Sequence, residues 1–211
     1  MTKTRQEILA KAPVQERSQQ THSAVLDAVE ALLHDRPFDQ ITTTAIAQEA
    51  GLTTGAIYGR FKSKDDLLPH LYVRYLDWVD QEVPIWFAKH DWTTLDPAQT
   101  SDLVADRIIR LHQTKPWLLR TVIIYLRGKQ RNPAHGARDH SNLVEAILKC
   151  FHHCKEASSV AEADLVFAVH AALTIAREIL IFPDAPMARA VYKNKTGLKR
   201  QISSLLQAAF K

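Results

Sequence analysis

The sequence predicts an all-α fold in which a three-helix N-terminal segment containing a helix-turn-helix precedes a larger C-terminal helical domain. Apolar residues recur at helical spacing through most of the chain, and prolines separate the apolar stretches. The sequence contains only six glycines in 211 residues and no alternating polar and apolar segment bounded by hairpin turns. A chain of this length has ample material for one large helical domain or two modest ones.

A flexible polar arm is expected over residues 1–14, and a first helix follows it over about residues 17–34. Apolar side chains recur there at helical spacing, and Pro37 marks the end of the helix. The residues that define this apolar stripe are Val25, Val29, Leu32 and Leu33.

Residues 41–64 are typical of two short helices joined by a tight turn. Gly51 is placed to end the first of these helices, and Thr53 is placed to cap the second. Small side chains at Ala47 and Ala56 allow the two helices to cross closely, as a helix-turn-helix requires. Polar side chains then lie on the outer face of the second helix.

A capping pattern, Ser63-x-x-Asp66, opens a long fourth helix that is expected to run towards Asp80. Pro69 is expected inside this helix, where it removes a backbone donor. The sequence therefore predicts a hinge at Pro69.

The remaining residues predict further helices, punctuated by Pro97, Pro116, Pro133, Pro183 and Pro186. The division into domains is expected to separate residues 15–66 from residues 67–211. The expected helices of the second domain span about residues 98–114, 116–128, 138–155, 162–181 and 196–210.

Composition indicates a soluble globular protein in a reducing interior. The formal net charge is +4, yet residues 1–66 contain eight Lys or Arg against nine Asp or Glu, so bulk charge does not indicate a nucleic-acid partner. Two cysteines make no disulfide framework, and the polar N-terminus is unlike a signal peptide. The longest apolar run, residues 165–182, is interrupted by His170, Arg177 and Glu178, which favours a buried helix over a membrane span. We therefore expect a cytoplasmic protein.

The segment from Thr42 to Lys64 closely resembles the helix-turn-helix of the tetracycline-repressor (TetR) family of bacterial transcriptional regulators. The resemblance covers about residues 15–75, and an ordered pattern of this length is far more specific than a bare helix-turn-helix. The matching residues are Thr42, Thr43, Ile46, Ala47, Ala50, Gly51, Thr53, Gly55, Tyr58, Phe61 and Lys64.

The resemblance implies a homodimeric DNA-binding regulator that recognises a double-stranded operator. It further implies a repressor released by a small-molecule effector; a ligand-responsive activator on the same fold is the alternative. No cofactor is expected.

The resemblance also assigns candidate DNA contacts. By motif position, hydroxyl groups and cations around the two short helices would contact phosphates, with Arg60 standing where a histidine is common, and Thr44, Thr54 and Ala56 would face bases. Physically, Lys64 opposes the dipole of the helix that it begins, at a cost of up to about 1 kcal/mol, which favours a bound anion there. A solvated lysine and a packed Tyr58 are the plainer alternatives. The candidates are Thr43, Thr44, Thr53, Thr54, Gly55, Ala56, Tyr58, Arg60, Lys62 and Lys64.

Aromatic residues of the second domain are candidates for an effector cavity, because small-molecule sites combine aromatic walls with a few polar groups. Each of them also fits an ordinary hydrophobic core. The candidates are Trp78, Trp86, Trp117, Tyr125 and Phe167.

Two apolar stripes on the last helices are candidates for a dimer interface, which the resemblance to the TetR family places there. The alternative is that both stripes serve the core of one chain. The candidates are Leu173, Leu180, Leu198, Ile202 and Leu205.

A cluster of Cys150, His153 and Cys154 shares one helical face and carries ligand types that zinc prefers. Only three ligands are local, and a fourth from His135 or His140 would depend on the fold. An amphipathic helix with half-buried cysteines explains the same residues, and no phosphate loop, His-Glu-x-x-His pair or nucleophile elbow accompanies them. A metal-dependent enzyme is therefore the less favoured alternative, and we expect neither a metal nor an enzymatic activity.

Overall fold

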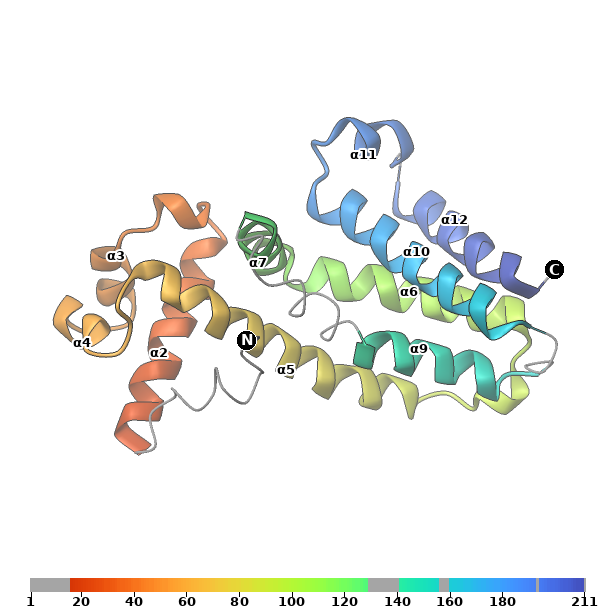
Figure 1. The fold of residues 1–211 in the computed structure, drawn as a ribbon, viewed down its shortest axis with the longest axis horizontal. Coiled ribbons are helices and arrows are strands. Elements are labelled where there is room, and N and C mark those ends of the chain that lie inside the picture. The colour runs from red at the N-terminus through yellow and green to blue at the C-terminus, as the bar shows by residue number, and fades with distance from the viewer. Residues whose placement is uncertain (1–15, 129–140, 156–159, 193, 211) are drawn as a thin grey trace. The chain divides into compact units, whose positions relative to one another are not determined.

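The computed structural model describes residues 16–128, 141–155, 160–192 and 194–210, and within them the chain forms helices and turns without a strand (Figure 1). The all-α prediction is thus confirmed, whereas the expected arm at residues 1–14 lies outside the described residues. The elements are α2 (Glu16–Leu33), η1 (Phe38–Gln40), α3 (Thr43–Glu49), α4 (Thr54–Tyr58), η2 (Lys64–Asp66), α5 (Leu67–Phe87), η3 (Trp92–Thr94), α6 (Pro97–Thr114), α7 (Pro116–Gly128), α9 (Ser141–His153), α10 (Glu162–Ile181), α11 (Pro186–Val191), α12 (Lys195–Gln207) and η5 (Ala208–Phe210).

The chain divides into two compact units, and the division falls within α5, between Asp77 and Trp78. The first unit takes in residues 1–77 and 117–136, and the second takes in residues 78–116 and 137–211. Helix α7 therefore groups with α2, α3 and α4 rather than with α6 and α9, its neighbours in the sequence.

The core of the first unit is built from the apolar stripe that the sequence predicts in the first helix, joined by α3, α4 and the start of α5. Val25, Val29 and Leu33 are buried on α2, and each short helix adds one large buried side chain, Ile46 from α3 and Ile57 from α4. Burial of these residues anchors two helices that are too short to be stable in isolation.

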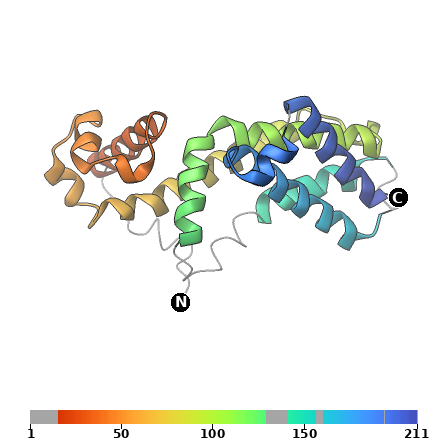
Figure 2. The same ribbon diagram turned by 90° about the horizontal axis from the view of Figure 1, so that it is seen from above.

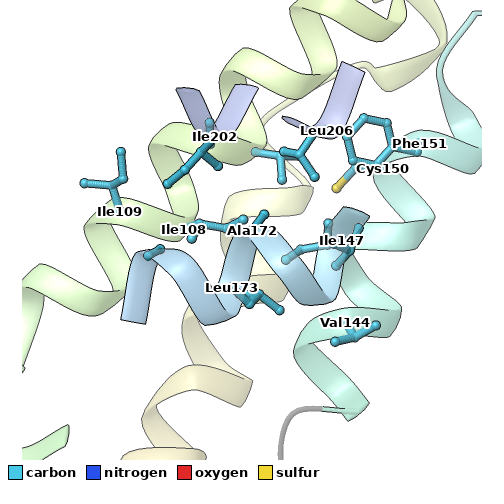
Figure 3. Close-up of a cluster of buried hydrophobic side chains, with 14 of the residues drawn as sticks. Ile108, Ile109, Val144, Ile147, Cys150, Phe151, Ala172, Leu173, Ile202 and Leu206 are labelled. Atoms are coloured by element: carbon cyan, nitrogen blue, oxygen red, sulfur yellow. The ribbon is translucent and has the colours of Figure 1, made fainter. Parts of the chain in front are cut away.

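The core of the second unit lies among α6, α9, α10 and α12, which supply the side chains in Figure 3. Helix α6 packs against both α10 and α12, and α10 also packs against α9 and α12. Figure 2 shows α10 and α12 side by side, as Figure 1 does. A hydrogen bond from Ser203 Oγ on α12 to Asp102 Oδ1 on α6 adds a polar tie between two of these helices.

The long apolar run of the sequence becomes α10, a helix that buries one face in the core of the second unit. Leu165, Val169 and Ala172 are fully buried along it. Within the part of the chain that the structure describes, no helix combines the length and apolar character that a membrane crossing needs.

The fourth helix departs from its prediction in two ways. Helix α5 continues to Phe87 rather than ending near Asp80, and the proline in its interior is Pro84 rather than Pro69. Because α5 begins at Leu67, Pro69 lies in its first turn. Backbone N–H groups of the first turn have no acceptor within the helix, so the N–H that proline lacks costs no hydrogen bond there. The hinge predicted at Pro69 therefore has no physical basis. The short helix α11, which begins with Pro186, was not predicted.

Truncating the second core tests this packing. Ile108→Ala, at a side chain with 0% exposure, should destabilise the protein by about 2–5 kcal/mol, because it removes buried methyl groups and leaves a cavity. Ile85→Ala is the matched control, since that side chain is 56% exposed and should change stability by less than about 0.5 kcal/mol. Urea unfolding measures both values, and equal effects would contradict the described core.

Candidate nucleic-acid interface

The turn between α3 and α4 is fixed by Gly51. This residue has φ of 64°, a conformation that costs other residues about 1–2 kcal/mol. The Leu52 N–H donates to the Ala47 carbonyl (2.8 Å) and the Gly51 N–H donates to the Gln48 carbonyl (3.2 Å). These two bonds form a Schellman motif, so the predicted helix end at Gly51 is confirmed with its mechanism.

Threonine side chains cap both short helices. Thr42 Oγ1 accepts a hydrogen bond from the Ala45 N–H (3.1 Å) and Thr53 Oγ1 accepts one from the Ala56 N–H (3.2 Å). The cap predicted at Thr53 is confirmed. Each hydroxyl uses its oxygen for the cap, which leaves its O–H proton able to donate to a phosphate oxygen.

The ten predicted contact residues lie on α3, at the cap of α4 or on α4 itself, or between α4 and the end of η2. Six of them are exposed, including Tyr58, whose hydroxyl donates to Thr43 Oγ1 (3.2 Å) and so links α4 to α3. Thr43, Thr54, Ala56 and Lys64 are half-buried. Polar and small groups, together with the exposed Tyr58 ring, therefore form one outer surface around the short helix α4.

The three cations of this surface differ in their surroundings. Arg60 and Lys62 are exposed, and Arg60 Nη1 donates to the Ala56 carbonyl (3.3 Å). Lys64 is half-buried, and its Nζ donates to the carbonyls of Phe38 (2.8 Å), Asp39 (3.2 Å) and Ile41 (2.8 Å). The structure thus gives Lys64 intramolecular partners that its motif position does not imply.

Two histidines and Phe61 pack behind the surface. His22 on α2 stacks on the Phe61 ring, and its Nε2 lies 3.3 Å from Nδ1 of His70 on α5. Burial, assisted by the nearby His70, Arg74 and Arg60, lowers the pKa of His22 from 6.5 to about 4. His22 is therefore neutral at pH 7. No local pattern predicts this pair, because its members are 48 residues apart in the sequence.

Two acids of α2 are paired with a cation from α5. Arg74 forms ion pairs with Asp27 and, through Nε, with Glu30 (3.2 Å). Both acids are among the nine counted over residues 1–66, whereas Arg74 lies outside that segment. The ion pairs therefore offset part of the negative charge of residues 1–66.

The five aromatic residues expected at an effector site are divided between the two units. Trp117 and Tyr125 belong to the first unit, whereas the other three belong to the second. Trp117 lies against His34 with ring centroids 3.5 Å apart, and Trp86 lies 5.1 Å from the ring of Trp92. Phe167 is 73% exposed on α10. Trp117 and Trp86 thus take part in ring contacts within their own units, Phe167 lies on the surface, and an effector cavity lined by the five residues stays a prediction.

Three residues expected at a dimer interface are already used within the chain. Leu173, Leu198 and Ile202 are buried in the core of the second unit, and Leu180 and Leu205 are partly buried against it. The amphipathic stripe was correctly found, but its buried side faces the chain's own helices. These three side chains have no surface left to offer a second copy.

The Cys/His cluster has no metal-binding geometry. Cys150 and Cys154 are buried, and their Sγ atoms contact the carbonyls of Ala146 (3.3 Å) and Phe151 (3.1 Å). Burial raises the pKa of the Cys150 thiol to about 12, and His153 is exposed. Among the residues with described positions, no three His, Cys, Asp or Glu side chains are placed to hold a metal ion. His135 and His140 lie outside those residues.

Comparison with known proteins shows that the segment containing the helix-turn-helix is similar to a known family. Residues 25–71 match the model for bacterial regulatory proteins of the tetR family. No curated protein matches the chain.

Solved structures share the fold of nearly the whole chain. A TetR transcriptional regulator from a Rhodococcus species has a TM-score of 0.53 at 15% identity, covering 92% of this chain and 97% of that one. The TetR family regulator PfmR from Thermus thermophilus has a TM-score of 0.58 at 18% identity, covering 87% and 97%. GusR from Salmonella enterica has a TM-score of 0.55 at 16% identity, covering 93% and 98%.

The fold and the surface around α4 define the class of the protein: it is a helix-turn-helix, DNA-binding transcriptional regulator. Residues 25–71 thus match the TetR family, and nearly the whole chain has the fold of solved TetR-family regulators.

The His22 environment predicts a pH-dependent stability. Below pH 6.5 the unfolded chain protonates at His22 while the folded chain does not until about pH 4, so stability should fall as pH decreases through this window. His22→Gln should flatten this dependence because the amide does not titrate, and the exposed His170→Gln should leave it unchanged. Urea midpoints across the window measure it; a wild-type slope in His22→Gln would refute the assignment.

Proposed function

We propose that this chain is a homodimeric, cytoplasmic repressor that binds a pseudo-palindromic operator and leaves it when a small molecule binds. The observation that carries the proposal is the outer surface of α3 and α4, where capping hydroxyls and exposed cations surround the candidate recognition helix α4. A motif of this size reads only a few base pairs, so two copies are needed to specify a site.

On this surface, we assign different residues to the phosphates and to the bases. The exposed cations Arg60 and Lys62, with the hydroxyls of Thr43, Thr53 and Tyr58, serve the phosphates. Thr44, Thr54 and Ala56 face the bases, and the backbone at Gly55 permits close approach. Threonine hydroxyls bond to several base edges and methyl groups touch thymine, so the preference is modest at each position.

Dimerisation is assigned to the outer side of α10. Phe167, Ala171 and Ile175 lie at helical spacing on one face, and Phe167 and Ile175 are exposed in the single chain. The exposed side chains of α12 are polar or charged, on Lys195, Thr196, Arg200, Gln201 and Ser204. A second copy related by two-fold symmetry would cover the apolar face of α10. Removing this face from water is favourable in free energy.

An effector site is proposed in the second unit, near the end of α10. A pocket of about 360 Å³ is lined by Gln113, Pro116, Ile179, Leu180, Pro183 and Tyr192. This volume lies within the range of small-molecule sites, about 300–1,000 Å³. The lining carries an amide and a phenol but no charged side chain, which supports a neutral or weakly polar effector.

Repression is preferred over activation on the family resemblance. A regulator that leaves its operator on binding an effector acts through the differential affinity of that effector for the two states.

The DNA contacts predict two distinct mutant behaviours on a duplex selected from a random pool with the wild-type chain. Arg60→Ala should weaken binding to every sequence and reduce the slope of log K against log salt by about one. Thr54→Ala should keep the slope and relax preference at one base pair, by about 1–3 kcal/mol. Fluorescence anisotropy across salt concentrations separates them. Two variants that both match wild type would overturn the assigned surface.

The dimer face predicts a folded monomer. Phe167→Glu places a charge at the centre of the proposed seam, where it would be buried without a partner in the dimer but fully solvated in the monomer. Analytical ultracentrifugation should therefore show a monomer with wild-type helix content. Ile85→Glu, at another exposed apolar residue, is the matched control and should stay dimeric. A dimeric Phe167→Glu variant would place the interface elsewhere.

A further inference from the structure

We infer that Lys64 is a positioning residue that holds the DNA-reading helices in place, and that it is not one of the phosphate contacts. The inference rests on the proposed DNA-binding function and deepens it. It assigns to Lys64 a role different from the one that its place in the motif suggests.

The ammonium group of Lys64 is saturated by the chain itself. It has three protons, and its Nζ donates to the carbonyls of Phe38, Asp39 and Ile41 at 2.8, 3.2 and 2.8 Å. The same Nζ lies 4.8 Å from the centre of the Phe38 ring, at cation–π distance. A phosphate contact would require at least one of these bonds to break.

The three carbonyls belong to the segment that leads into α3. Phe38 and Asp39 are in the single turn η1, and Ile41, whose side chain is buried, directly precedes the α3 cap Thr42. A single 3₁₀ turn offers few bonds of its own to fix such a segment. The charged donor supplies three from a distant part of the chain, 23 to 26 residues later.

Lys64 itself stands at the start of η2, where Ser63 N–H donates to Asp66 Oδ2 (3.0 Å) in a capping box. The ammonium therefore ties the entry of α3 to the entry of α5. Since Tyr58 links α4 to Thr43 on α3, the position of both reading helices depends on this tie. A cation at the start of a helix costs stability through the dipole, and the three carbonyls offset that cost without any bound anion.

Lys62 provides a matched comparison, because it is exposed and lies two residues away. Lys64→Met keeps the apolar stem of Lys64 and removes all three donors, whereas Lys62→Ala removes an exposed side chain together with its charge. Hydrogen exchange of the free chain and salt titration of operator binding are measured for both variants. The operator is the duplex selected by the wild-type chain.

Lys64→Met should accelerate amide exchange across α3 and weaken operator binding about tenfold at every salt concentration, with an unchanged salt slope. Lys62→Ala should leave exchange unchanged and lower the slope by about one. A Lys64→Met variant with wild-type exchange and a slope reduced by about one would overturn the inference. Exchange is measured without DNA, so it decides the role of Lys64 even if the wild-type chain were to select no duplex.

Amine labelling of the wild-type chain gives a test that needs no variant to fold. Lys64 should react with a methylating reagent more slowly than Lys62 in the free protein, and added operator should protect Lys62 only. Equal reactivity of the two amines, with protection of Lys64 by operator, would contradict the inference.

Discussion

Helices α3 and α4 have seven and five residues, so neither holds its conformation without support from the rest of the first unit. The Schellman motif at Gly51 is the constraint on which their arrangement depends, because it fixes the angle at which one helix leaves the other. The caps at Thr42 and Thr53 satisfy the helix starts, and the burial of Ile46 and Ile57 holds both helices to the core. With α3 and α4 held in this way, the proposed DNA binding depends on the polar residues on their outer side.

The helices of the two units are held in place by different kinds of interaction. In the first unit, the short helices α3 and α4 are held by specific bonds, such as those of Lys64 and Tyr58, and many of their outer residues are exposed. In the second unit, longer helices bury wide apolar stripes against one another, and the polar tie between Ser203 and Asp102 is an addition to that packing. The second unit thus offers a stable body with a pocket and an exposed apolar face on α10.

Local signals were enough to predict most of the fold. The helix end at Gly51 follows from a conformation that suits glycine. Helix α10 follows from the periodicity of its apolar residues and from Pro183, just beyond its end. Long-range partners could not be predicted. The amphipathic stripe of α12 indicated that Leu198 and Ile202 are buried, but not whether the same chain or a second copy buries them. Likewise, Lys64 was read from its motif position, while its carbonyl partners become visible only once the chain is folded.

Footprinting of the full chain on a duplex selected from a random pool tests the central claim most directly, namely that paired copies of the α3–α4 surface read DNA. Two copies related by a two-fold axis should protect two half-sites whose centres lie about 10 base pairs, or a multiple of this, apart. Selection of no sequence above the random background, or protection of a single uninterrupted half-site, would contradict the account.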